Sequence, residues 1–256
     1  MVSVSVVVIT LNEEKNLERC LRSVDGIADE IVIVDSFSND KTAEISESFG
    51  ARFIQNMFQG HIQQKNFALQ QAKFPYILSL DADEELSGEL RASIIAIKSN
   101  WKHDGYTFNR LTSYCGKFIK HGSWYPDRKL RLFDVRRGKW GGVNPHDSMI
   151  LQNGSTIKQL KGNILHYSFY SIEEHLAKVN NYTSIAAKEA YARGEKSGIF
   201  RIIFSPLWAF VRDYIVKKGF LAGYYGFIIY SIVAWEKFLK YVKLNEFYRA
   251  NGKEGM

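Results

Sequence analysis

Four acidic residues follow a short apolar run in the stretch YILSLDADEEL, residues 76–86. Asp81 and Asp83 are two positions apart, so in an extended strand their side chains project to the same side and can share a cation. Carboxylate oxygens are the ligands that hard divalent ions prefer, and these ions commonly bridge to phosphate oxygens. The alternative is a solvated strand end with a helix-capping acid. Because the pair follows a buried strand, the pattern favours a cation site.

Polar side chains also stand at three other places in the same part of the chain. They are Thr10, Asn12 and Glu13 after a first apolar run, Asp35 at the end of a second, and Lys65 within a helical pattern. In open α/β sheets, ligands bind in the crevice beyond the carboxyl ends of the strands. If the topology is of this kind, these residues converge with Asp81 and Asp83 around one ligand.

The apolar periodicity over the first hundred residues supports that topology. The β-branched run at 4–9 is typical of a parallel strand covered on both faces, and Leu17, Cys20, Leu21 and Val24 form the stripe of a buried helix. Strands alternating with helices imply right-handed crossovers and a mainly parallel sheet. The further segments are strands at 30–36, 51–55 and 76–80, helices within 38–50 and 61–73, strands at 105–111, 128–134 and 155–160 separated by Gly- and Pro-containing loops such as 121–127 and 140–147, and helices from Ile172 onward.

Length and composition limit the classes of protein to which this chain can belong. A chain of 256 residues with 46% apolar composition can bury one large domain, or a domain with an appendage. Cys20 and Cys115 are too few for a disulfide framework or a cysteine-based zinc site, which favours a reducing compartment. No basic residue precedes the first apolar run and acids follow it, so we interpret it as a strand and not as a signal peptide.

The basic character of the chain belongs to its C-terminal quarter. Residues 193–256 hold eleven Lys/Arg and five Asp/Glu, so they carry all but one unit of the net charge of +7. The uncharged stretch 219–235 is shorter than the roughly 20 residues of a spanning helix and contains three Gly and three Tyr. Basic helices rich in aromatic residues are typical of an anionic lipid interface. We therefore expect peripheral membrane attachment, with a packed helical cap or a homodimer as the alternative.

Together these motifs resemble the family-two inverting glycosyltransferases, which have the GT-A fold. In that family a first strand ending in T-x-N-E, a second ending in D-S and a fourth ending in a D-x-D motif form the nucleotide-sugar site. Here the corresponding segments are VVVITLNEE, IVIVDSFSNDKT and LSLDADEE, and the match is good over residues 1–100. The later half resembles the subgroup that adds sugars to lipopolysaccharide core, the beta-glucosyltransferase-like enzymes, through QQKNFAL, WYPDRKLRLF, NPHDSM and LHYSFYSIEEH.

Two positions depart from the pattern of that subgroup. Lys65 stands where these enzymes often have Arg before Asn, which keeps the charge and loses the bidentate fork. His146 and Asp147 stand where a His-Glu pair is more usual, which leaves the carboxylate chemistry possible with a shorter reach.

The resemblance implies an α/β, Rossmann-like GT-A fold with a mainly parallel central sheet and a C-terminal helical extension associated with a membrane. The GT-A domain is expected over 1–170, with a nucleotide-sugar half at 1–100 and an acceptor and catalytic half at 101–170. The apolar, basic helical region then covers 171–256.

The resemblance also implies roles for particular residues. The expected donor-binding residues are Thr10, Asn12, Glu13, Asp35, Lys65, Asp81 and Arg131. A divalent cation, Mn²⁺ or Mg²⁺, would act as a Lewis acid on the leaving diphosphate. Asp83 is expected to contact this ion directly. His166 is expected to be a further ligand, because several GT-A enzymes use a late histidine in this way; a structural histidine is the alternative.

Inverting transfer needs a base on the face opposite the leaving group, to take the proton of the acceptor hydroxyl. Asp147 is our candidate, against an ordinary turn aspartate, and Glu84 and Glu85 are next. Aromatic faces suit sugars and Arg suits phosphates, so we expect the segment 124–128 to bind the acceptor. The alternative is a surface loop that closes over the sheet. The acceptor residues would be Trp124, Tyr125, Asp127 and Arg128.

We therefore expect a metal-dependent hexosyltransferase that moves a sugar from a nucleotide sugar, a UDP-sugar first, to a saccharide of lipopolysaccharide core or another lipid-linked cell-envelope glycan. We expect it in the cytoplasm, on the inner face of the cell membrane, with no nucleic-acid partner. A sugar nucleotidyltransferase is an alternative, although no Gly-rich loop follows the first strand. A non-catalytic GT-A-like scaffold with a membrane- or partner-binding tail is another.

Overall fold

The computed structural model describes residues 1–143 and 146–252, without the side chains of Val143 and His146. The chain forms two compact units, which are described separately. The first contains residues 1–111 and 127–167, and the second contains residues 112–126 and the chain from Ser168 onward. The helical region thus shares its unit with a short segment from the middle of the chain, which the sequence does not indicate.

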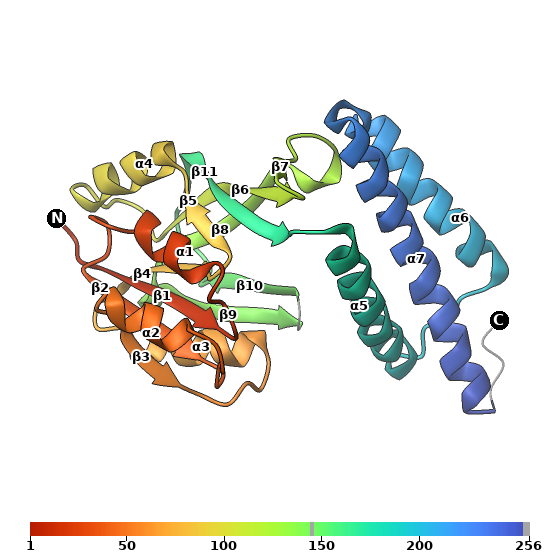
Figure 1. Cartoon of the computed structure of the whole chain (residues 1–256), viewed down its shortest axis with the longest axis horizontal. Helices are drawn as coiled ribbons and strands as arrows, with labels where there is room; N and C mark the ends of the chain where they lie inside the picture. The colour runs from red at the N-terminus through yellow and green to blue at the C-terminus, as the bar shows by residue number, and fades with distance from the viewer. Residues whose placement is uncertain (144–145, 253–256) are drawn as a thin grey trace. The chain divides into compact units, whose positions relative to one another are not determined.

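Four parallel strands open the first unit and alternate with helices, as the sequence predicts. Their order in the sheet is β3-β2-β1-β4 (Figure 1). Val4, Val6 and Val8 pack with α1, whereas Val7 packs with α3, so the central strand is covered on both faces. The elements are β1 (Val4–Thr10), α1 (Leu17–Ser23), β2 (Glu30–Asp35), α2 (Thr42–Ser48), β3 (Arg52–Gln55), α3 (His61–Gln71) and β4 (Tyr76–Asp81).

The same sheet continues in the order β4-β8-β6-β11-β5, in which β4 with β8, β8 with β6, and β11 with β5 pair antiparallel. These elements are β5 (Glu84–Leu86), α4 (Gly88–Lys98), β6 (Gly105–Tyr114), β8 (Asp127–Asp134), the short helix η2 (Val135–Arg137) and β11 (Ile157–Phe169). Helix α4 begins at Ser87, whose hydroxyl accepts a hydrogen bond from the Leu90 N–H. This architecture is the α/β arrangement of the GT-A fold, which confirms the fold class expected from the sequence.

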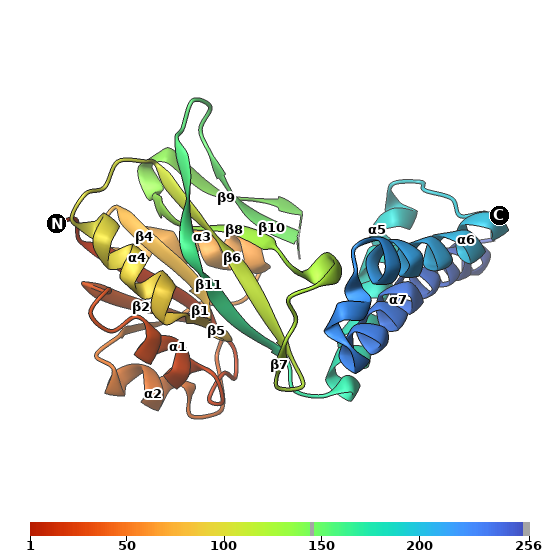
Figure 2. The same ribbon diagram turned by 90° about the horizontal axis from the view of Figure 1, so that it is seen from above.

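A hairpin formed by β9 (Gly138–Val143) and β10 (His146–Leu151) replaces the loop expected at 140–147. The glycines that suggest a loop are needed for close packing between the two strands. A Cβ atom at Gly138 would collide with the carbonyl oxygen of Ile150, and one at Gly141 would crowd the Ile150 side chain. The hairpin lies on the opposite side of the sheet from α1 and α2 (Figure 2).

The second unit is mainly helical, and its long helix α7 packs along both α5 and α6 (Figure 1). Its elements are β7 (Lys117–Phe118), the 3₁₀ turn η1 (Gly122–Trp124), α5 (Ile172–Ala192), α6 (Ile199–Phe210), the π-helical turn η3 (Val211–Val216), the 3₁₀ turn η4 (Gly219–Ala222) and α7 (Tyr224–Ala250).

The uncharged stretch 219–235 does not form one helix. It is divided at Gly223, whose φ of 67° and ψ of −142° suit glycine and end η4 before α7 begins. Its residues Gly226, Ile229 and Tyr230 are buried within the unit. None of the helices in the described part of the chain is both long and apolar enough to span a membrane.

Aromatic rings pack around the buried His175 in the second unit. His175 Nδ1 lies 3.2 Å from the Tyr114 hydroxyl, and its ring packs on Phe169 with 4.4 Å between centroids. Trp124 stacks on Phe169 and contacts His175 edge-on. Burial, with a smaller contribution from the charge of Lys178, lowers the pKa of His175 from 6.5 to about 4.

This pKa predicts an acid-labile contribution to stability. The buried ring binds its proton more weakly than the same ring in the unfolded chain, so unfolding takes up a proton between about pH 6.5 and 4. The free energy of unfolding is therefore highest above that range and falls by about 3 kcal/mol as the pH drops through it. Urea titrations at a series of pH values measure this slope.

His175→Gln is the matched variant, because it keeps a hydrogen-bonding group near Tyr114 and does not titrate. We expect it to be less stable than the wild type above pH 6.5 and to lack this component of the slope. An unchanged slope between pH 6.5 and 4 in that variant would assign the acid sensitivity to other groups.

Candidate active site

The carboxyl ends of the parallel strands meet at one edge of the sheet. Thr10 is the register partner of Asp35 in the β1–β2 pair, and Ile9 is the partner of Asp81 in the β1–β4 pair. The last residues of three strands are therefore neighbours. This confirms the convergence that the alternating pattern predicts for these strand ends.

Asp35 organises the loop that follows β2. Its buried carboxylate accepts a hydrogen bond from the Thr10 hydroxyl, with 2.9 Å between Oγ1 and Oδ1. The same carboxylate accepts from the backbone N–H and the hydroxyl of Ser38. In this structure Asp35 therefore holds two loops together, and contact with a nucleotide would compete with these bonds.

The loops after β1 and β2 are joined by several further hydrogen bonds. Asn12, which adopts a left-handed backbone conformation with a φ of 55°, accepts from the Asn39 N–H. The Glu13 N–H donates to the Thr42 hydroxyl, and the Glu13 carboxylate accepts from Asn16. The residues of this region that were predicted to bind the nucleotide sugar are thus linked by hydrogen bonds into one loop structure.

Lys65 links two carboxylates at the centre of the site. Its ammonium group lies 2.9 Å from Asp81 Oδ1 and 2.9 Å from Asp147 Oδ2. Only 4% of Lys65 is exposed, so its charge depends on these partners. The structure therefore joins the predicted donor residues Lys65 and Asp81 to the predicted base, which lies in strand β10 and not in the loop expected there.

Arg131 occupies the other oxygen of Asp81. Its Nη2 lies 2.7 Å from Asp81 Oδ2 and 3.2 Å from Oε1 of the fully buried Glu84. Burial alone would raise the pKa of the Asp81 carboxyl, but the charges of Arg131 and Lys65 outweigh it and hold that pKa well below its usual range. The two cations thus favour the anionic form of Asp81.

The ion pairs continue from Glu84 toward the beginning of β8. Arg110 lies 3.8 Å from Glu84 and pairs with Asp127 at 2.8 Å, and Lys129 also pairs with Asp127, at 3.1 Å. We call the whole series the ion-pair chain. Its members alternate in sign and comprise Asp147, Lys65, Asp81, Arg131, Glu84, Arg110, Asp127 and Lys129.

Asp81 and Asp83 do not share one extended strand, because β4 ends at Asp81 and residues 82–83 form a turn. The Asp83 carboxylate lies instead beside His166, with 3.2 Å between Oδ2 and Nε2. The antiparallel register of β5 and β11 produces this contact, since it places His166 opposite Glu84. The two predicted metal ligands are therefore adjacent, and the His146 side chain lies outside the described residues.

The donor set of this pair suits a divalent cation. An aspartate oxygen suits both Mn²⁺ and Mg²⁺, whereas an imidazole nitrogen favours the transition metal Mn²⁺, and the oxygens of a phosphate could complete the coordination. Within the described part of the chain, no third His, Cys, Asp or Glu joins them to form a protein-only metal cluster. The arrangement fits an ion that is held jointly by protein and substrate.

Two further residues, Trp140 and Asn66, belong to this site and were not predicted from the sequence. The Trp140 ring lies under both cations, 4.5 Å from the Lys65 ammonium and 5.3 Å from the Arg131 guanidinium carbon. Asn66 exchanges two hydrogen bonds with the Trp140 backbone, which ties α3 to β9. The asparagine beside Lys65 in QQKNFAL was the available signal.

The four predicted acceptor residues are divided between the two units. Trp124 and Tyr125 belong to the second unit, where the Trp124 ring stacks on Phe169. Asp127 and Arg128 belong to the first unit, where Asp127 is paired within the ion-pair chain and Arg128 is exposed. The acceptor role of these residues stays a prediction.

The fold and the polar strand ends define an α/β protein of the GT-A type, and comparisons with known proteins specify the family. The family model described as glycosyl transferase family 2 matches residues 5–155. An uncharacterized glycosyltransferase of Rickettsia bellii is 34% identical over 257 residues, covering 95% of this chain and 86% of that protein. The chain belongs to glycosyl transferase family 2.

A further relative has a more specific name. The lipopolysaccharide core biosynthesis glycosyltransferase LpsC of Rhizobium meliloti is 30% identical over 230 residues, covering 88% of this chain and 85% of that protein. Among solved structures, S. aureus TarS 1-349 in complex with UDP is similar over 97% of this chain and 92% of that chain, with a TM-score of 0.46 and 16% identity. That structural likeness is too remote to support an argument about this chain.

The ion-pair chain predicts a large difference between two neighbouring glutamates. Glu84→Gln removes a fully buried charge and leaves Arg131 with Asp81 as its remaining close acid, so we expect a loss of about 3 kcal/mol in the free energy of unfolding. Urea denaturation followed by circular dichroism measures this loss.

Glu85→Gln is the matched control. The Glu85 side chain is 28% exposed, faces Arg19 at 3.8 Å and accepts a hydrogen bond from the Tyr167 hydroxyl, which glutamine can also accept, so removal of its charge should cost about 1 kcal/mol or less. Equal losses in the two variants would show that the ion-pair chain contributes no more than an exposed pair.

Proposed function

We propose that this family-two glycosyltransferase is an inverting, divalent-cation-dependent hexosyltransferase. Its donor would be a nucleoside diphosphate sugar, a UDP-sugar first, and its acceptor a saccharide of lipopolysaccharide core or another lipid-linked glycan. The observation that carries the proposal is the Asp147–Lys65–Asp81 arrangement, which links a candidate base to the donor edge of the sheet. The name of the LpsC relative supports the acceptor class.

The charge balance of the site supports a cation. The ion-pair chain holds as many acids as bases, so its own charges cancel. A donor diphosphate adds about two negative charges, and Asp83 adds another beside it. A divalent cation held by Asp83 and His166 would offset this excess, and it would supply Lewis-acid stabilisation of the leaving diphosphate when bound.

Lys65 would couple donor binding to the base. A diphosphate oxygen is a strong acceptor for an ammonium group and would compete with Asp81 and Asp147 for Lys65. Because Lys65 is held at 2.9 Å from both carboxylates, a small displacement toward the donor weakens its hold on Asp147. The base would then be released for the acceptor hydroxyl when a donor is present.

The transfer step follows from these positions. Asp147 takes the proton of the acceptor hydroxyl as the acceptor oxygen forms a bond to the anomeric carbon. The bond from that carbon to the diphosphate oxygen breaks, and its electron pair leaves with the nucleoside diphosphate. Attack on the face opposite the leaving group inverts the anomeric configuration.

Asp147→Asn tests the base. The change is nearly isosteric and removes proton-accepting capacity, so we expect turnover to fall by a factor of about 10² or more while donor affinity changes little. Release of nucleoside diphosphate in the presence of acceptor measures turnover, and calorimetric titration measures donor binding. Asp25→Asn, at an exposed position after α1, is the control for loss of an aspartate.

Normal turnover in the Asp147 variant would move the base elsewhere. Tight nucleotide binding by the wild type, with no transfer or hydrolysis across a broad panel of donors and acceptors, would favour the non-catalytic scaffold instead.

Asp83→Ala and His166→Ala test the cation. Each change removes one side of the 3.2 Å pair, so UDP affinity measured with Mn²⁺ or Mg²⁺ should fall to the level seen in EDTA. UDP affinity in EDTA itself should change by less than about twofold, because the metal-independent contacts remain. His103→Ala, at a half-buried position in the same unit, controls for loss of an imidazole.

Wild-type UDP affinity that is identical with metal and with EDTA would end the cation assignment. Because nucleotide binding is measured without turnover, this result is independent of whether the correct acceptor is present.

A further inference from the structure

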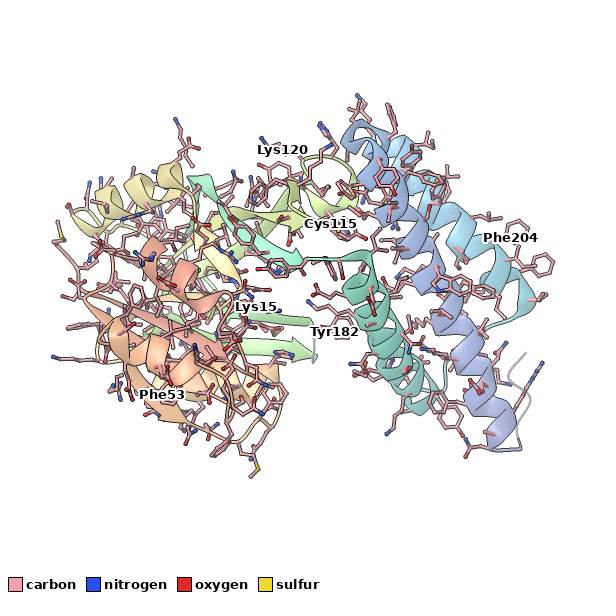
Figure 3. All side chains as sticks on the ribbon, in the orientation of Figure 1. Lys15, Phe53, Cys115, Lys120, Tyr182 and Phe204 are labelled. Atoms are coloured by element: carbon pink, nitrogen blue, oxygen red, sulfur yellow. The ribbon has the colours of Figure 1, made fainter. Side chains whose placement is uncertain are left out.

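Helix α6 and the following turn η3 present an apolar surface to solvent. Of the residues of α6, all of which the structure describes, Ala209 is the one that is buried. Phe200 is 75% exposed and Trp208 is 60% exposed, and Figure 3 shows the Phe204 ring directed away from the neighbouring helix α7. We call this surface the α6 face; it consists of Ile199, Phe200, Ile203, Phe204, Leu207, Trp208, Val211, Ile215 and Val216.

The spacing of these residues is helical, so they form one continuous stripe and not scattered exposed positions. The opposite side of α6 packs on α7, which means that the helix already has its partner within the unit. Soluble proteins rarely expose a contiguous apolar surface of this size without a partner that covers it. We therefore expect a binding partner outside the unit to cover the α6 face.

The charges around the α6 face are basic. Residues 193–218 contain six Lys/Arg and two Asp/Glu. Both acids are engaged within the protein, since Asp213 is buried and paired with Arg212, and Glu195 is paired with Arg193. Exposed basic side chains lie near both ends of the stripe, Lys196 and Arg201 on one side and Lys217 and Lys218 on the other, and of these Lys217 is 3.5 Å from Asp213.

We propose that the α6 face binds an anionic lipid bilayer and lies within its headgroup region. Apolar and aromatic side chains on one helical face, with lysine and arginine at its margins, match the interfacial zone of a membrane. The basic margins would contact lipid phosphates while the apolar stripe enters the acyl boundary. This narrows the lipid contact to α6 and η3 within the C-terminal quarter, residues 193–256, for which the sequence predicts membrane attachment.

A second copy of the chain fits the same surface less well. A two-fold dimer through the α6 face would bring together the basic margins of both copies, because both ends of the stripe are positive. Like charges facing each other across an interface oppose association, whereas anionic headgroups complement them. Charge complementarity therefore favours lipid as the occupant.

This inference does not depend on the transfer reaction, because vesicle binding requires neither donor nor acceptor. The full chain is mixed with vesicles of phosphatidylcholine alone, or of phosphatidylcholine with 30% phosphatidylglycerol, and the bound fraction is measured by flotation. We expect binding to the anionic vesicles that weakens at least fivefold in high salt. Failure to bind vesicles of either composition would overturn the proposal.

Two pairs of variants locate the contact. Phe204→Glu with Trp208→Glu should lower the partition coefficient at least tenfold, whereas Ile150→Glu, at an exposed apolar position of β10, should leave it unchanged. Lys217→Gln with Lys218→Gln should lower it several-fold, whereas Lys158→Gln with Lys161→Gln removes the same charge from exposed positions of β11 and should have little effect. If a control lowered the partition coefficient as much as the variant it is matched with, the assigned surface would be contradicted.

The fluorescence of Trp208 reports the depth of the contact. Anionic vesicles should shift the tryptophan emission to shorter wavelength in the wild type and not in Trp208→Phe, which keeps an aromatic ring and should still bind. Light scattering without vesicles tests the competing occupant. A stable dimer that becomes a monomer in Phe204→Glu would assign the α6 face to a second copy and overturn the lipid proposal.

Discussion

The carboxylate of Asp81, held between the Lys65 ammonium and the Arg131 guanidinium, is the interaction on which the site depends. Both cations are almost fully buried, and buried charges are tolerated only when opposite charges are close. The pairing therefore dictates which acids must surround them. Asp147 supplies the second acid for Lys65, and Glu84 supplies the second acid for Arg131. Through these pairs the strand ends, helix α3 and the β9–β10 hairpin belong to one network of charges.

Such a structure constrains the fold as well as the chemistry. The members of the ion-pair chain come from six strands and helices, with three of them on β8, so a shift of one residue in the register of β4 or β8 would turn a charged side chain to the wrong face of the sheet. Trp140 adds an uncharged constraint, because its ring lies against both cations and Asn66 fixes its backbone. The cost of burying charge thus helps to select one register.

The sequence predicts the parts of this arrangement that local periodicity encodes. The strands β1 to β4 and their helices follow from apolar spacing, and the strand-end residues follow from the rule that ligands bind beyond parallel strands. The β9–β10 hairpin was missed because its glycines are typical of loops, whereas they serve close strand packing. Arg110 was missed since its role depends on Glu84 and Asp127, which are distant in sequence. Non-local pairing of this kind leaves no periodic signal.

The C-terminal quarter shows the same limit in a different form. A sequence rich in apolar, aromatic and basic residues has the same composition whether its helices pack together, associate with a second copy or lie on lipid. The three-dimensional arrangement shows which of these helices are packed and which are exposed. Helix α7 turns Ile229, Tyr230 and Leu244 inward, whereas α6 turns most of its apolar residues outward. Because α7 supplies the core of the unit, α6 is free to keep an apolar surface that the fold itself does not need.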